Sequence, residues 1–101
     1  MSHRVRLAAA ALGIALTAVG ASHAAGPTRA DLLVASCFGC HGSDGHSPGA
    51  IPSLAGKSPD FIEQAMRGFR AGARPGTVMS RHATGYSDEE IRLIAQFFST
   101  H

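Results

Sequence analysis

The sequence lacks several features that would indicate a zinc cluster, a repeat architecture or more than one domain. It has only two cysteines in 101 residues, Cys37 and Cys40. A zinc site built from cysteine and histidine usually shows a second paired cluster, which this sequence does not contain. Internal repeats, low-complexity tracts and a strand-rich pattern near the cysteines are also missing. A chain of this length can hold one small domain.

Charged residues are few, and they balance once the first 24 residues are set aside. They make up 16% of the chain, and the formal net charge is +2. Arg4 and Arg6 belong to the first 24 residues, so the nine lysines and arginines are reduced to seven, against seven aspartates and glutamates. The small basic excess therefore belongs to the N-terminal segment. Nothing in the remaining balance indicates nucleic-acid binding.

The N-terminal segment is typical of a secretory signal peptide. Two arginines precede an apolar stretch from Leu7 to Val19, and small residues follow up to Ala24, after which cleavage is expected. The apolar stretch is shorter than the about 20 residues that a membrane span needs. We therefore expect residues 1–24 to be removed and residues 25–101 to form one domain without a membrane span in the periplasm. The alternative is an uncleaved N-terminal anchor.

The run from Cys37 to His41 reads Cys-Phe-Gly-Cys-His, which is the attachment signal of a covalent c-type haem. Two thiolates at this spacing can add to the two vinyl groups of one haem, and the imidazole of His41 then reaches the iron from the same turn. Three alternatives are a thioredoxin-like redox pair, a zinc site that takes its fourth ligand from His46 or His82, and a disulfide between Cys37 and Cys40. The motif predicts one covalent haem c, bonded to Cys37 and Cys40, with His41 as an axial iron ligand.

The segment from Gly42 to Lys57 is rich in Gly, Ser and Pro, and it predicts a loop beside the haem. Ile51, Pro52 and Leu54 can cover one haem face. A metal-bound histidine usually donates its other ring N–H to an oxygen acceptor. We expect the backbone carbonyl of Pro52 to be this acceptor for His41.

The second axial ligand is expected in the segment from Ala73 to Tyr86, which is also predicted to be a loop. Met66 falls in an apolar helical stripe, where core packing is its expected role. Met1 would leave with the signal peptide, so Met79 is the predicted sixth iron ligand, on a segment that can fold over the opposite haem face. His82 is the alternative, which would give two histidine ligands.

Three helices are predicted from capping residues and apolar periodicity. The first has Thr28 as its N-cap. The second has Ser58 as its N-cap, followed by a proline at the first helical position, and it ends at Gly72 or in the region of Gly76. The third begins with a capping box formed by Ser87 and Glu90.

Each predicted helix has an apolar side that we expect to be buried. In the first helix these residues are Leu32, Leu33 and Ala35 or Ser36. In the second they are Phe61, Ile62, Ala65, Met66 and Phe69. In the third, which we expect to pack across the first helix, they are Ile91, Ile94, Ala95 and Phe98. The outer side of the second helix is either a solvated face or a partner-docking patch, with Arg67, Arg70 and Arg74.

These features together resemble the class I c-type cytochromes over the whole of residues 25–101. The shared residues are Cys37 to His41, Gly42, Asp44, Gly45, Pro52, Leu54, Ala55, Gly56, Met79 and Tyr86 to Glu90. More narrowly, three runs resemble the haem subunit of flavocytochrome c sulfide dehydrogenase. These runs are Gly68 to Gly72, Thr77 to Arg81 and Gly85 to Ser87.

The resemblance implies an all-α class I cytochrome c fold, with three to four helices and long loops wrapped around one covalent haem. It also implies a periplasmic flavoprotein partner, containing FAD, that oxidises sulfide and passes electrons to this haem and on to a downstream acceptor. Ligation by both His41 and Met79 would leave no open iron position, so we expect single-electron transfer and no catalytic residue in this chain. The alternative is a free soluble carrier of a respiratory or photosynthetic chain.

Overall fold

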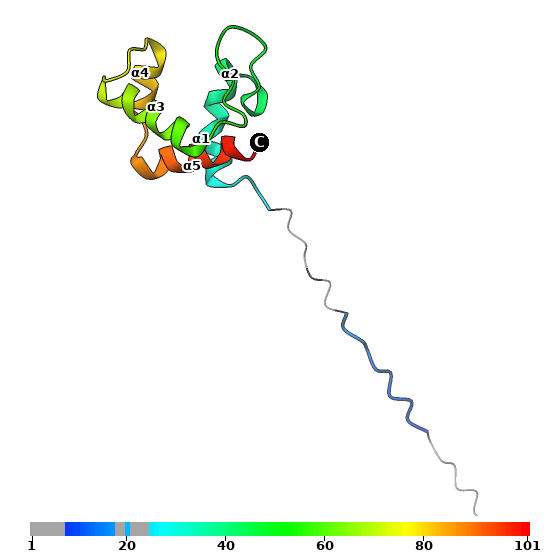
Figure 1. Cartoon of the computed structure of the whole chain (residues 1–101). Coiled ribbons are helices and arrows are strands. Elements are labelled where there is room, and N and C mark those ends of the chain that lie inside the picture. Colours follow the sequence, from blue (N-terminus) through cyan, green and yellow to red (C-terminus); the bar gives the residue numbers. More distant parts are fainter. Residues whose placement is uncertain (1–7, 18–19, 21–24) are drawn as a thin grey trace, which may run out of the picture.

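A computed structural model describes residues 8–17, 20 and 25–101 of the chain, and the described part is helical with no strand (Figure 1). The all-α class expected from the sequence is therefore confirmed. Arg4, Arg6 and the expected cleavage site at Ala24 lie outside the described residues. Among the residues that are described, no helix has the length and apolar character to cross a bilayer.

The secondary structure consists of short helices joined by loops. The described elements are α1 (Arg29–Val34), η1 (Ala35–Cys37), α2 (Phe38–His41), η2 (Ser43–Gly45), α3 (Pro59–Ala71), α4 (Val78–Ala83) and α5 (Asp88–Ser99), where η marks a 3-10 turn.

The three predicted N-caps are confirmed. The Thr28 hydroxyl accepts a hydrogen bond from the Asp31 N–H, the Ser58 hydroxyl accepts one from the N–H three residues later, and Ser87 and Glu90 form a reciprocal capping box. Each cap satisfies an N–H group that would otherwise have no partner in the first turn of its helix. At the other end, α3 stops at Gly72, whose left-handed backbone conformation closes the last turn.

The core lies where α5 packs against both α1 and α3, as Figure 1 shows at the base of the globule. The predicted apolar side of α5 is confirmed, since Ile91, Ile94, Ala95 and Phe98 are all buried. Burial of one such large side chain contributes about 1.5–3 kcal/mol to folding. Phe97 is also buried and packs edge-on against Phe98.

The sequence-based account of α1 is wrong in detail. Val34 is the buried residue, while Leu32 is 65% exposed and Ala35 and Ser36 are exposed as well. Leu33 is partly buried against the core, as expected. The helix is only six residues long and passes directly into η1, so its 3.6-residue repeat is too short to fix which side faces inward.

The segment from Ala73 to Tyr86 is not a continuous loop as predicted, because residues Val78–Ala83 form α4. This helix packs against α3, and Ala83 is fully buried. The fold therefore holds Met79 on a helix that is anchored to its neighbour.

Candidate functional site

A largely apolar cavity of about 560 Å³ lies between the attachment motif, the loop that follows it, α3 and α4. Its volume falls in the range of about 300–1,000 Å³ that is typical of sites for small molecules and cofactors. Figure 1 shows α2 on one side of the upper part of the globule and α3 and α4 on the other. The residues predicted to form the site, Cys37, Cys40, His41, Pro52 and Met79, all line this one cavity.

The attachment motif is fixed to the core by its own second residue. The ring of Phe38 lies 6.1 Å from the ring of Phe97 and 6.3 Å from that of Phe98, measured between centroids. Aromatic pairs at such separations are favourable in tilted and edge-on arrangements. Phe38 therefore ties α2 to α5 while the two cysteines and His41 are available to the cavity.

The two cysteines differ in their surroundings, and no disulfide joins them. Cys37 is buried and Cys40 is exposed. Burial raises the pKa of the Cys37 thiol, because the charged thiolate loses hydration. Among the described residues, no three His, Cys, Asp or Glu side chains converge in a way that would hold a metal ion.

The ring of His41 is held by the loop across the cavity. The Nδ1 atom lies 2.6 Å from the carbonyl oxygen of Pro52, and the residue is only 9% exposed. A carbonyl can only accept, so Nδ1–H is the donor in this contact. The bond fixes the ring plane, and in the neutral imidazole it makes Nε2 the nitrogen with the lone pair, which is the form in which a histidine binds a metal.

A glycine turn follows the motif immediately. Gly42 has a φ of +84°, in the region that L side chains rarely adopt. A Cβ atom placed there would lie 1.9 Å from the carbonyl oxygen of His46. Glycine is therefore required at this position, where the chain leaves α2 and turns into the loop. The side chain of His46 is exposed.

The apolar stripe of α3 faces the cavity. Ile62 and Met66 are buried at its back, whereas Phe61 is 49% exposed at its edge. The full stripe predicted from the sequence lines the cavity, with Phe61, Ile62, Ala65, Met66 and Phe69. The apolar side of α3, which the sequence predicted to face the core, thus belongs to both the core and the cavity wall.

Two candidate iron ligands lie on α4, and both line the cavity. Met79 is partly buried, and His82 follows three residues later on the same helix. The Nε2 atom of His82 lies 3.1 Å from the Tyr86 hydroxyl and 3.4 Å from the Ser36 hydroxyl. Sequence reasoning missed these contacts, because 46 residues separate Ser36 from His82 and no local pattern joins them.

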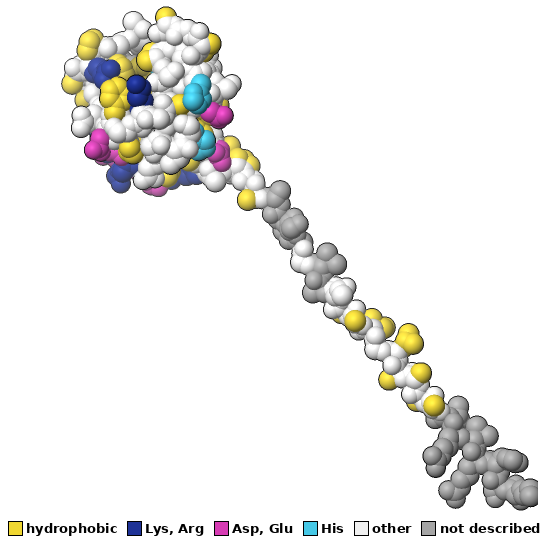
Figure 2. Space-filling view, turned by 45° about the vertical axis from the view of Figure 1, so that its right-hand side comes forward, with side chains coloured by type: hydrophobic (Ala, Val, Ile, Leu, Met, Phe, Trp, Pro, Cys, Tyr) yellow, Lys and Arg dark blue, Asp and Glu magenta, His cyan; other side chains and the backbone are white. Residues whose placement is uncertain are grey.

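Two basic side chains contact aromatic rings beside the cavity. Lys57 and Arg74 lie over the rings of Phe61 and Phe69, 5.6 and 5.0 Å from the centroids, beside the cavity. These distances are typical of cation–π contacts. Figure 2 shows Lys and Arg atoms directly beside hydrophobic atoms on one side of the globule.

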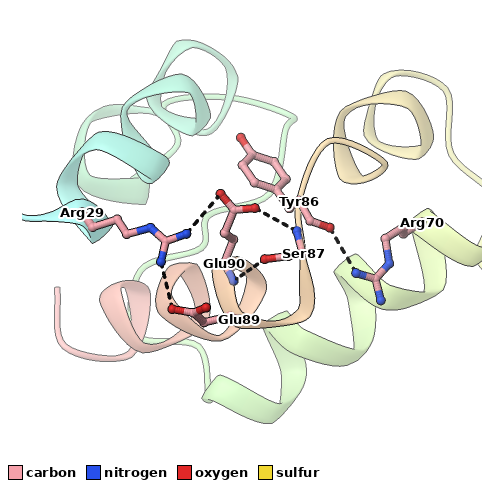
Figure 3. A network of polar contacts seen from close by, with 6 residues as sticks. All are labelled: Arg29, Arg70, Tyr86, Ser87, Glu89 and Glu90. Carbon is pink, nitrogen blue, oxygen red and sulfur yellow. Dashed lines mark hydrogen bonds and ion pairs between the residues drawn. The ribbon is translucent and has the colours of Figure 1, made fainter.

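Arg29, Arg67 and Arg70 are tied to acidic partners within the chain. Arg70 donates to the backbone carbonyl of Tyr86, and Arg29 pairs with Glu89 across α1 and α5 (Figure 3). Arg70 also pairs with Asp88. The bond from Arg70 lowers the pKa of the Asp88 carboxyl, because it stabilises the charged form. The predicted arginine face on α3 is therefore partly engaged in holding α5.

The chemistry of this donor set fits a haem c. Two thiols stand beside an imidazole with a free nitrogen, and a thioether lies across an apolar space. Thiolates, imidazole and thioether are the protein groups that bind haem or its iron in c-type sites. The low polarity of the walls suits a large apolar ring.

Comparison with known proteins gives several similar chains, although no protein-family model matches. The chain is 50% identical over 95 residues to the cytochrome subunit of sulfide dehydrogenase of Chlorobaculum tepidum, which covers 91% of this chain and 86% of that protein. It is 37% identical over 71 residues to cytochrome c-554(548) of Halomonas halodenitrificans, covering 66% and 86%. It is 39% identical over 95 residues to the thiosulfate dehydrogenase electron acceptor of Thiomonas intermedia, covering 92% of this chain but 42% of that protein.

Proposed function

The chain belongs to the c-type cytochromes, and on that premise we propose that it is a one-haem electron-transfer subunit of a periplasmic sulfide dehydrogenase. Its function as a cytochrome is electron transfer, and its relatives imply haem c as the cofactor. The observation that carries the proposal is that two cysteines, a histidine and a methionine line one apolar cavity. The similarity to a sulfide dehydrogenase cytochrome subunit supports the named role.

In the proposed site, Cys37 and Cys40 would bond the haem covalently, and His41 and Met79 would bind its iron. When bound, the haem supplies a one-electron redox couple. Pro52 orients His41 through the Nδ1–H bond and makes the ring a better electron donor. With His41 and Met79 both on the iron, no open position would remain for a substrate, so oxidation of sulfide would belong to a partner chain.

The methionine ligand and the cavity walls would both raise the reduction potential of the haem. A methionine ligand raises the reduction potential of a haem. Apolar side chains such as Leu54 and Met66 keep water away from the charged ferric state, which acts in the same direction. The resulting potential suits acceptance of electrons from a reduced flavin and delivery to an acceptor of higher potential.

The remaining parts of the proposal concern export and partner. Residues 1–24 direct export and are removed, so that residues 25–101 form the mature protein in the periplasm. The partner is a flavoprotein that oxidises sulfide.

Purification from the native periplasm through a C-terminal tag tests this role. We expect a flavin-containing chain to co-purify and anaerobic sulfide to reduce the haem of the complex, whereas thiosulfate leaves it oxidised. Thiosulfate is the matched control because one relative accepts electrons from thiosulfate dehydrogenase. A haem protein that purifies alone and is not reduced by sulfide would refute the subunit role and favour a free carrier. A colourless chain would refute the cytochrome assignment itself.

A further inference from the structure

His82 lies in the same cavity as Met79 but points its metal-binding nitrogen at two hydroxyl groups. Its Nε2 atom is 3.1 Å from the Tyr86 hydroxyl and 3.4 Å from the Ser36 hydroxyl, and these two hydroxyls are 3.1 Å apart. The rings of His82 and Tyr86 also meet edge-on, with centroids 5.4 Å apart. Nε2 is thus held from two sides.

The three groups form a consistent chain of hydrogen bonds. The Ser36 hydroxyl can donate to the Tyr86 oxygen, and the Tyr86 hydroxyl can in turn donate to Nε2 of His82. In this arrangement a hydroxyl proton covers the lone pair that a metal would need. The imidazole must break these contacts before it can act as a ligand.

Both hydroxyls come from firmly held backbone. Ser36 lies in η1, immediately before Cys37. The carbonyl of Tyr86 accepts a hydrogen bond of 3.1 Å from Arg70, and Figure 3 shows the ring of Tyr86 directed away from that contact. The next residue, Ser87, caps α5. The hydroxyl pair is therefore positioned by η1, by Arg70 and by the start of α5, and Tyr86 is also tied to α4 because its N–H donates to the Ala83 carbonyl.

We propose that Ser36 and Tyr86 are positioning residues that hold the His82 imidazole away from the haem iron and so leave the second axial position to Met79. This inference rests on the proposed function, because it takes the cavity as the haem site. Imidazole is a strong iron ligand, and His82 is only three residues from Met79 on one helix. Without the hydroxyl pair, the two side chains compete for one position.

The test compares three variants of the holoprotein with the wild type: Ser36→Ala/Tyr86→Phe, the same pair with His82→Phe, and His82→Phe alone. Losing one hydrogen bond of this kind would shift the equilibrium between Met79 and His82 as the iron ligand roughly fivefold. The double variant loses two such bonds. We expect the double variant to lose more than half of its sulfur-to-ferric-iron charge-transfer band and to have a lower reduction potential. The triple variant and His82→Phe alone should keep the band, because no competing imidazole remains.

Each other outcome is decisive. An unchanged band and potential in the double variant would overturn the inference while leaving the cytochrome function intact. A band that is lost and does not return in the triple variant would also overturn it, because the loss would then reflect a loosened site and not His82. A wild type with a covalent haem but no such band would remove the Met79 assignment on which both proposals depend.

Discussion

The Nδ1 atom of His41 lies 2.6 Å from the carbonyl oxygen of Pro52, so the last residue of α2 is bonded to a loop eleven residues further along the chain. The acceptor belongs to the backbone, and the Pro52 side chain only limits the conformation of the loop that presents it. This separation of roles can be tested by substitution.

Pro52→Ala should leave the haem spectrum unchanged, because the carbonyl acceptor is retained. It should lower the free energy of unfolding by about 0.4–1 kcal/mol, since the unfolded chain gains freedom when a proline is removed. His41→Ala is the contrasting variant and should lose the six-coordinate spectrum. Absorption spectra and urea titrations of the holoproteins measure both effects. A Pro52→Ala protein with the spectrum of His41→Ala would contradict the backbone role.

Met79→Ala should abolish the charge-transfer band between methionine sulfur and ferric iron and lower the reduction potential. The matched control is Met66→Leu, because Met66 is buried and lines the same cavity but is assigned to the wall. This swap conserves volume and should cost less than about 1.5 kcal/mol of stability. The visible spectrum and potentiometry provide the comparison. Loss of the band in Met66→Leu alone would mean that the two methionines have been assigned the wrong way round.

Gly42→Ala should destabilise the holoprotein by about 3 kcal/mol or more. The new Cβ would meet backbone atoms of His46, and an alanine backbone is strained at the positive φ of Gly42. Gly49→Ala is the control, because nothing lies within 4 Å of a Cβ built there. That variant should stay within about 0.5 kcal/mol of the wild type. Equal urea midpoints for the two variants would show that the Gly42 turn is not needed.

Acid should weaken the cap of α5. The N–H of Ser87 donates to the Glu90 carboxylate at 3.0 Å and holds the pKa of that carboxyl below its usual range. A lowered folded-state pKa contributes stability that is complete above the ordinary glutamate pKa and is lost as the pH falls through the folded value. Stability should therefore be constant above about pH 5 and decline below about pH 4.

Glu90→Gln should make that decline less steep, because this group no longer titrates. The lowered pKa values of Asp31 and Asp88 should preserve the remainder of the slope. Urea unfolding of both proteins across this pH range gives the comparison. Identical slopes would mean that the capping box does not contribute to the acid sensitivity.

Local signals predict helices α1, α3 and α5 well, because each begins with a serine or threonine that caps its own first turn. Helix α4 carries no such signal. Thr77 makes no capping hydrogen bond, Pro75 and Gly76 precede it, and the helix spans only six residues. It exists because it packs against α3, and a tertiary contact of this kind cannot be derived from the local sequence.

The candidate site follows the same division. The attachment motif and the Pro52 contact can be inferred from the chemistry of a short stretch, because their spacing is local. The hydroxyl pair around His82 cannot, since Ser36 and Tyr86 are 50 residues apart in the sequence. The packing of the helices in the folded chain brings them together.

The most direct test of the whole account is the intact mass of the protein purified from the periplasm and unfolded in acid. The account predicts a single species that corresponds to residues 25–101 plus one haem, since two thioether bonds to Cys37 and Cys40 survive unfolding. The mass of the bare polypeptide, with the haem lost on unfolding, would contradict it.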